Sequence, residues 1–294
     1  MQIIEWLKAA LYGIVEGITE WLPVSSTGHL ILLSEWFPFA FSEDEAFLGE
    51  FWEMFEVVIQ LGAILAVLVL FRRRLFPFGK RKTSAEKRDT WRLWGKVLVA
   101  SVPAAVVGLL GDKLLEKLTG KDIDGWLYNG LVVAVALIVY GVAFIVVERM
   151  RKGRLPRVDS VYDISPLTAL FIGLFQALSL IPGTSRSGST ILGSILLGVS
   201  RTAAAEFSFF MAVPVMVGAS GVKSLGFARY LRAEQISMPA NAWIILGVGC
   251  AVSFFISLVA IRFLTDFVKK HSFAPFGVYR IILGAAVLIW YFVR

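Results

Sequence analysis

Charged residues, cysteine and histidine are all scarce in this sequence of 294 residues. Only 17% of the residues are charged, against about 25% in soluble domains, and 57% are hydrophobic. The single cysteine, Cys250, excludes a disulfide framework and a cysteine-ligated metal centre. We expect no signal peptide, because Glu5 and Lys8 precede the first apolar stretch and no clear cleavage site follows it.

Long apolar runs dominate the chain instead and predict an all-α polytopic membrane protein. Several runs approach or exceed the roughly 18–20 residues that span a bilayer as a helix. An outer-membrane barrel would show short alternating segments, which do not fit these runs. We expect spanning helices over residues 54–71, 97–111, 128–148, 203–222, 241–264 and 276–293.

Basic residues gather in two loops, which predicts the orientation of the chain. Residues 72–92 hold nine basic residues and two acids, and a second basic loop covers 149–157. The positive-inside rule places both loops in the cytoplasm and the acidic segment 34–53 outside. The net charge of +7 is therefore explained by topology and predicts no nucleic-acid partner.

Two further apolar helices are each interrupted by a proline and are too short to span. The pieces cover 6–22 and 25–33 around Pro23, and 166–181 and 189–199 around Pro182. Proline removes a helix donor and clashes with the preceding turn. Such a break in the membrane is tolerated only where it lines a cavity or is packed in protein, so we predict two re-entrant hairpins. The alternative for the first is one kinked spanning helix.

The two broken helices are related by an internal repeat. A shift of 160 residues superposes Ala9, Gly13, Ser25, Gly28, Ile31, Leu32 and Ser34 on Ala169, Gly173, Ser185, Gly188, Ile191, Leu192 and Ser194. Residues 1–157 and 158–294 of this single membrane domain then each hold a re-entrant helix and three spans. Because three is odd, the second repeat is predicted to be inverted, with the site at the repeat interface. Chance similarity is the alternative.

The second break is rich in groups that bind anions. Gly183 permits unusual dihedrals, Ser185, Ser187 and Thr190 supply hydroxyls, and Arg186 supplies a planar cationic fork suited to phosphate. The stretch leads into a helix, whose N-terminus also favours anions. The alternative is a packing loop in which Arg186 pairs with a carboxylate.

The first break adds reactive groups to the same pattern. Ser25, Ser26 and Thr27 stand at a helix start, and Glu16 and Glu20 share one helix face. Two such carboxylates predict a Mg²⁺ or Ca²⁺ ion shared with substrate phosphate, or one protonated Glu acting as acid or base. His29 lies within reach of Ser25 and Ser26 and is a candidate base. The alternatives are solvated carboxylates and a structural histidine.

These stretches resemble the two signature motifs of the bacterial undecaprenyl-pyrophosphate phosphatase family, the bacitracin-resistance type. The matching segments are Glu-Gly-Ile-Thr-Glu-Trp-Leu-Pro-Val-Ser-Ser-Thr-Gly-His at 16–29 and Pro-Gly-Thr-Ser-Arg-Ser-Gly-Ser-Thr at 182–190, with a third similar stretch at 55–63. The resemblance implies that Glu16 and Glu20 are the acidic pair, Ser26 and His29 the reactive pair and Arg186 the phosphate clamp. Supporting phosphate ligands would be Ser25, Thr27, Gly183, Ser185, Ser187 and Thr190.

The resemblance also implies an activity and a location. It implies hydrolysis of undecaprenyl pyrophosphate to the monophosphate carrier used in peptidoglycan synthesis, with a divalent cation, at the periplasmic side of the bacterial inner membrane. The partners would be the polyprenyl pyrophosphate lipid and the bilayer, and homodimer formation is left open.

Two other functions fit parts of the pattern. A lipid transporter would also use inverted repeats with broken midplane helices. Another lipid phosphatase class places a histidine four residues after Ser-Arg, but Thr190 occupies that position here.

Overall fold

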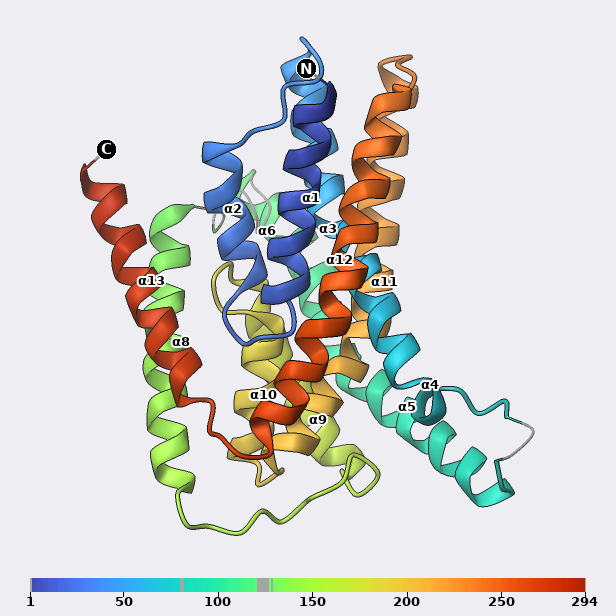
Figure 1. Cartoon of the computed structure of the whole chain (residues 1–294), viewed down its shortest axis with the longest axis vertical. Helices are drawn as coiled ribbons and strands as arrows, with labels where there is room; N and C mark the ends of the chain where they lie inside the picture. Colours follow the sequence, from blue (N-terminus) through green and yellow to red (C-terminus); the bar gives the residue numbers. More distant parts are fainter. Residues whose placement is uncertain (1, 80–81, 121–126, 128, 294) are drawn as a thin grey trace. The chain divides into compact units, whose positions relative to one another are not determined.

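The computed structural model describes residues 2–79, 82–120, 127 and 129–293, and these residues are largely helical (Figure 1). The elements are α1 (Gln2–Thr19), α2 (Ser26–Trp36), α3 (Glu45–Leu70), α4 (Arg72–Leu75), α5 (Ser84–Val106), the π-helix η1 (Val107–Gly111), α6 (Asp112–Thr119), α8 (Gly130–Arg151), α9 (Pro166–Ala177), the 3-10 helix η2 (Leu178–Leu180), α10 (Arg186–Leu196), α11 (Arg201–Ala233), α12 (Ala240–Val268) and α13 (Ala274–Val293). The all-α polytopic fold class is confirmed.

Within the described residues, six helices are long and apolar enough to cross a membrane, and each contains most or all of one predicted span. The predicted lengths were too short, most clearly for 97–111. That helix runs from Ser84 to Thr119 through η1. Its start is fixed by a capping box in which the Glu86 amide donates to Thr83 Oγ1 (3.2 Å) and the Thr83 amide donates to Glu86 Oε2 (2.7 Å). Hydropathy reports the apolar part of a helix and does not report its ends.

The first break is a helical hairpin, so the alternative of one kinked helix is wrong. Helix α1 ends at Thr19, earlier than predicted, and α2 begins at Ser26 after a turn containing Pro23. The two helices run antiparallel, because Tyr12 Oη donates to the carbonyl of Phe37 across them (2.9 Å).

The second break has the same local geometry. Helix α10 begins at Arg186, three residues before the predicted 189, because Ser185 caps it by accepting from the Gly188 amide (3.1 Å). Ser185 has φ = 70° and Ser25, its partner under the 160-residue shift, has φ = 76°. Each serine immediately precedes its helix. The repeat therefore extends to an uncommon backbone conformation for a residue other than glycine.

The chain forms two compact units. The first comprises residues 1–21, 26–70 and 212–262. Its core is aromatic, with Tyr12 of α1 packed against Trp52 and Phe55 of α3. Helix α12 lies close to α1, because a Cβ on Gly13 would stand 2.6 Å from the carbonyl oxygen of Gly249.

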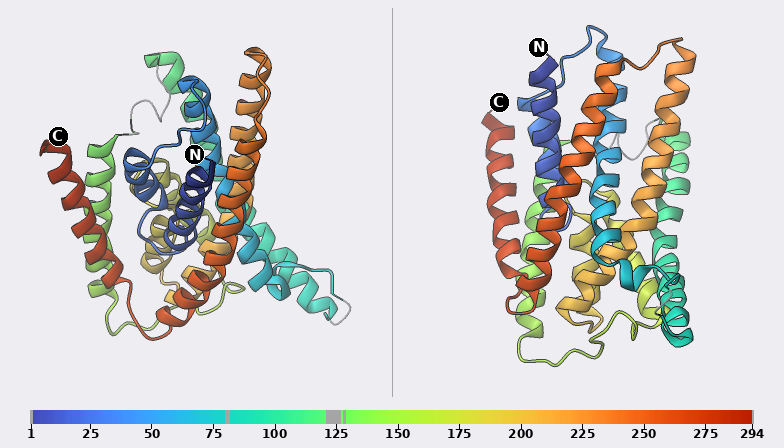
Figure 2. Two further views of the ribbon diagram at one scale, coloured as in Figure 1. Left: turned by 45° about the horizontal axis from the view of Figure 1, so that its top comes forward. Right: turned by 45° about the vertical axis from the view of Figure 1, so that its right-hand side comes forward.

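The second unit comprises residues 22–25, 71–211 and 263–294. Helices α8 and α13 lie side by side along much of their length (Figure 2). Helix α9 packs on α5, where a Cβ on Gly173 would overlap the carbonyl oxygen of Ala100. Helix α10 packs back on α9, with Gly193 against the ring of Phe175.

Each unit contains a close contact between helices at a glycine, and these two glycines are related by the repeat. Gly13 and Gly173 are partners under the 160-residue shift, and each lies against the backbone of a long helix, α12 or α5. Each unit also takes helices from both sequence halves. The compact units therefore do not coincide with residues 1–157 and 158–294, and the inverted arrangement of these halves stays a prediction.

Candidate functional site

The acidic residues of the first stretch are buried one helical turn apart in the first unit. Glu16 is fully buried and Glu20 is 4% exposed. Although α1 ends at Thr19, the Glu20 amide still donates to the carbonyl of Glu16 (3.0 Å), which keeps both on the α1 side of the turn. Burial of two carboxylates is costly without compensating partners, so this position is a functional candidate.

The turn between α1 and α2 brings Ser26 close to Glu20. Ser26 Oγ donates to Glu20 Oε2 at 2.6 Å, and Ser26 is itself buried. A hydroxyl held by a carboxylate in this way is the arrangement of a nucleophile and its general base. From the sequence, His29 was the candidate for that base. In the structure His29 and Thr27 are half-buried on α2, and the predicted role of each stays a prediction.

In the second unit, the predicted phosphate clamp is oriented by a residue that sequence analysis missed. Arg186 is half-buried, and its Nη1 donates to the carbonyl of Ser208 on α11 (2.7 Å). The hydroxyls of Thr190 and Ser208 lie 2.7 Å apart, and Thr190 Oγ1 also donates to the carbonyl of Arg186 (2.9 Å). Fully buried Thr190 therefore supports the position of Arg186 through Ser208.

The remaining groups of the second stretch shape its backbone. The hydroxyls of Ser185 and Ser187 lie 3.1 Å apart, and Ser187 Oγ donates weakly to the carbonyl of Leu22 (3.4 Å). Gly183 has φ = 91°, and a Cβ there would stand 2.6 Å from the carbonyl oxygen of Val133. Glycine is therefore required at 183 for conformation and for close packing.

Arg280 of α13 joins the backbones of both breaks within the second unit. Its Nη1 donates to the carbonyl of Pro23 (3.1 Å), and its Nη2 donates to the carbonyls of Gly183 (2.6 Å) and Thr184 (3.0 Å). The side chain is fully buried, and its Cζ lies 5.5 Å from the centroid of the Tyr140 ring. Buried and buttressed in this way, Arg280 holds the turn 22–25 against the turn that precedes α10.

Arg280 was not predicted from the sequence, although a usable signal was present. It is an ionisable residue within an apolar spanning helix, and such residues are rare and usually functional. Arg280 lies outside the two polar stretches and belongs to no motif, so the pattern at the breaks did not point to it. Ser208 gave no comparable signal, because a serine is tolerated in any helix.

The first stretch supplies some of the oxygen ligands that a hard cation such as Mg²⁺ needs, but not a complete set. Among the described residues no group of three or more His, Cys, Asp or Glu side chains is placed to hold a metal ion. Glu16 and Glu20 supply two buried carboxylates. Mg²⁺ is commonly held by one or two carboxylates together with water and substrate phosphate, so the pair fits this mode of binding.

Known proteins of one family are similar to this chain over nearly its whole length. Residues 9–286 match the family described as "Bacitracin resistance protein BacA". An undecaprenyl-diphosphatase of Enterococcus faecalis strain ATCC 700802 / V583 is 50% identical over 284 residues, which cover 97% of this chain and 96% of the relative. An undecaprenyl-diphosphatase of Streptococcus pyogenes serotype M5 is 48% identical over 294 residues, which cover 100% of this chain and 99% of the relative.

Proposed function

The chain belongs to the bacitracin resistance protein BacA family, and on this premise we propose how its two polar stretches hydrolyse undecaprenyl pyrophosphate. The enzyme is an undecaprenyl-diphosphate phosphatase of the membrane and releases undecaprenyl phosphate and orthophosphate. This activity recycles the lipid carrier for peptidoglycan synthesis and confers bacitracin resistance. The observation that carries the proposed mechanism is the buried hydrogen bond from Ser26 to Glu20.

Substrate binding is assigned to the groups that favour anions. Arg186 presents a cationic fork on the first turn of α10, where the helix N-terminus adds to its attraction for phosphate. The hydroxyls of Ser25, Ser185 and Ser187 border the same breaks. Arg280 and Thr190 act behind them as positioning residues, because their hydrogen bonds go to the protein.

The chemical step uses the Ser26–Glu20 pair. Ser26 Oγ attacks the terminal phosphorus while its proton passes to Glu20 Oε2, and the bond to the bridging oxygen breaks. Undecaprenyl phosphate leaves, and a water then hydrolyses the phosphoserine to orthophosphate. Arg186 stabilises the charge that develops on the phosphoryl oxygens. In the alternative route a water activated by His29 attacks directly.

A divalent cation, Mg²⁺ or Ca²⁺, is proposed at Glu16 and Glu20. These carboxylates would hold it, and it would neutralise phosphate charge when bound. We also propose that the site opens to the periplasm, as the resemblance to the family implies, while the basic segment 72–92 is predicted to be cytoplasmic. The polyprenyl tail would then lie in the bilayer beside the apolar helices.

Phosphate release from undecaprenyl pyrophosphate by purified protein tests the serine route. Ser26→Ala is expected to lower the rate about 100-fold or more, because both the nucleophile and the bond to Glu20 are lost. Ser34→Ala is the matched control, since Ser34 also lies on α2 but donates to the carbonyl of Ile31. Near-normal turnover by Ser26→Ala, with loss in His29→Ala, would replace the serine route by the water route.

Metal removal tests the cation separately. Turnover is expected to stop in a chelator and to return when Mg²⁺ or Ca²⁺ is restored. Glu16→Gln should raise the cation concentration needed for half-maximal rate. Unchanged turnover after exhaustive chelation rules out the metal part of the proposal while leaving the Ser26–Glu20 part open to its own test.

A further inference from the structure

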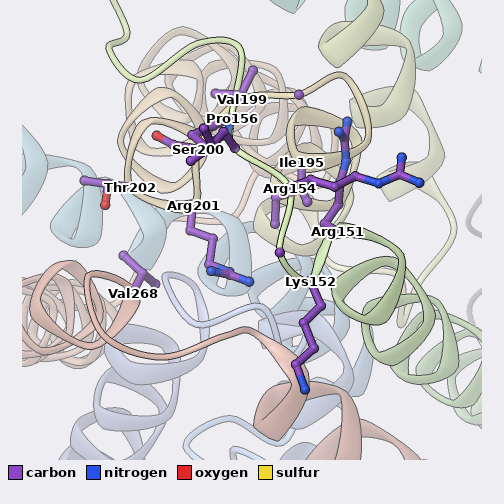
Figure 3. Close-up of a pocket in the computed structure, with 13 residues that line it drawn as sticks. Arg151, Lys152, Arg154, Pro156, Ile195, Val199, Ser200, Arg201, Thr202 and Val268 are labelled. Carbon is purple, nitrogen blue, oxygen red and sulfur yellow. The ribbon is translucent and has the colours of Figure 1, made fainter.

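A second polar feature lies in the second unit, at the C-terminal end of α10. It is a pocket of about 440 Å³. Four basic side chains line it, from Arg151, Lys152, Arg154 and Arg201, together with the hydroxyl residues Ser200 and Thr202 (Figure 3). No acidic residue is among the lining residues. Because α10 has 11 residues, the pocket stands about 16 Å along the helix from Arg186.

The walls of the pocket are fixed by hydrogen bonds. The amides of Arg157 and Val158 donate to the carbonyl of Gly198 (2.8 and 3.3 Å), and the amide of Ser200 donates to the carbonyl of Val158 (2.8 Å). These bonds hold the loop after α8 against the segment before α11. The cavity is therefore built by the fold and does not depend on surface side chains alone.

The positive charge of the pocket is only partly neutralised. Arg201 is paired with buried Glu148, whose Oε2 accepts from Arg201 Nη2 at 2.5 Å, and Glu148 Oε1 also accepts from the Phe273 amide (2.9 Å). Arg151 donates to the carbonyl of Leu196. Within the described part of the chain, Lys152 and Arg154 have no side-chain hydrogen bond or ion pair. Three positive charges therefore remain around the cavity.

We propose that this pocket binds the phosphate of an anionic phospholipid headgroup. Basic pockets between membrane helices commonly hold such headgroups. A lipid is favoured over free phosphate because spanning helices end at the pocket, α8 at Arg151 and α12 at Val268. Apolar residues also share the lining, and Leu155 is 89% exposed, as suits contact with acyl chains. The amides of the first turn of α11 add a weaker attraction for the anion.

Native mass spectrometry of the purified full-length protein tests this binding. The protein is incubated with mixed micelles of equal phosphatidylglycerol and phosphatidylcholine, and the retained lipid is counted. Wild type is expected to retain phosphatidylglycerol selectively. The double variant Lys152→Gln/Arg154→Gln should weaken that retention about tenfold or more, since each basic residue near a membrane surface contributes substantially.

A matched control and a competition arm make the result decisive. Lys87→Gln/Arg88→Gln removes the same charge from an exposed segment outside the pocket and should keep wild-type retention. Equal loss in both double variants would overturn the pocket in favour of general surface charge. Displacement of phosphatidylglycerol by millimolar inorganic phosphate alone would contradict the proposal that the bound phosphate belongs to a lipid. Phosphatase rates of both variants in detergent should stay within about twofold of wild type, since neither pair belongs to the proposed catalytic groups.

Discussion

Two arginines of the second unit have different surroundings, and the difference separates their roles. Arg186 is half-buried and is oriented by one carbonyl of α11, whereas Arg280 is fully buried and donates to three carbonyls of two turns. A side chain that binds substrate must reach it, while a side chain that orders backbone must be enclosed. Arg186 therefore suits the phosphate, and Arg280 suits the positioning of the breaks.

Replacing Arg280 with Met is expected to lower the free energy of unfolding by about 2–5 kcal/mol, because three buried carbonyls lose their donor. Thermal unfolding in detergent measures the effect. Arg262→Met is the control, since Arg262 is exposed on α12 and should tolerate the change. Equal stability of the two variants would show that Arg280 does not hold the turns.

Thr190→Val is expected to lower kcat about tenfold with little change in KM. Valine keeps the shape of threonine but loses the contact with Ser208, so the guanidinium of Arg186 is held less firmly during reaction. Thr190→Ser keeps the hydroxyl and should restore most of kcat. A serine variant as impaired as the valine variant would indicate packing as the cause.

At the residue scale, the sequence predicted which side chains gather at the breaks but not their partners. Residue type and spacing predicted that Glu16, Glu20 and Arg186 lie at the two breaks, and their functional roles stay predictions. The bond between Ser26 and Glu20 depends on the turn that follows α1, and the bond between Arg186 and Ser208 depends on how α11 packs. Neither packing nor turn geometry can be read from spacing along one helix.

At the scale of elements, the same kind of close contact between helices occurs at two related glycines. Gly13 lets α1 meet α12, and Gly173 lets α9 meet α5, at positions that the repeat relates. Small residues permit this approach between membrane helices, where packing replaces the hydrophobic effect as the driving force. A side chain at either position would separate a broken helix from its support.

Gly173→Ala is expected to destabilise the protein by about 1–3 kcal/mol, because the added methyl group would overlap the carbonyl of Ala100. The matched change Gly218→Ala lies in α11, where a Cβ meets no atom within 4 Å, and should be neutral or slightly stabilising. Thermal unfolding of both variants compares them directly. If Gly173→Ala is as stable as wild type, the α5–α9 contact is looser than described.

The elements themselves were predicted well where proline or hydropathy defined them. Pro23 and Pro182 predicted where both hairpins turn, and six apolar runs predicted the spanning helices. Helix ends were missed, as at α5, because caps and charged turns lie outside the apolar segment. The early start of α10 was not predicted, because Ser185 adopts a positive φ and the residue type serine does not indicate such a conformation.

At the scale of the whole molecule, the charge pattern gives a testable orientation. In a Cys250→Ser background, Glu43→Cys should react with a membrane-impermeant maleimide on intact bacterial cells, and Lys87→Cys should react only after permeabilisation. Both positions are exposed in the structure. The expectation follows from the acidic segment 34–53 and the basic segment 72–92. Labelling of Lys87→Cys on intact cells would contradict the predicted orientation of the two segments.

The central claim is that both polar stretches act on one pyrophosphate, and one comparison of rates tests it most directly. Orthophosphate release from undecaprenyl pyrophosphate is measured for wild type, Glu20→Gln and Arg186→Lys, after each is shown to unfold at a similar temperature. Each variant is expected to lose about 100-fold or more in kcat/KM, because one loses the base bonded to Ser26 and the other the planar fork. Near-wild-type release by either folded variant would contradict the claim.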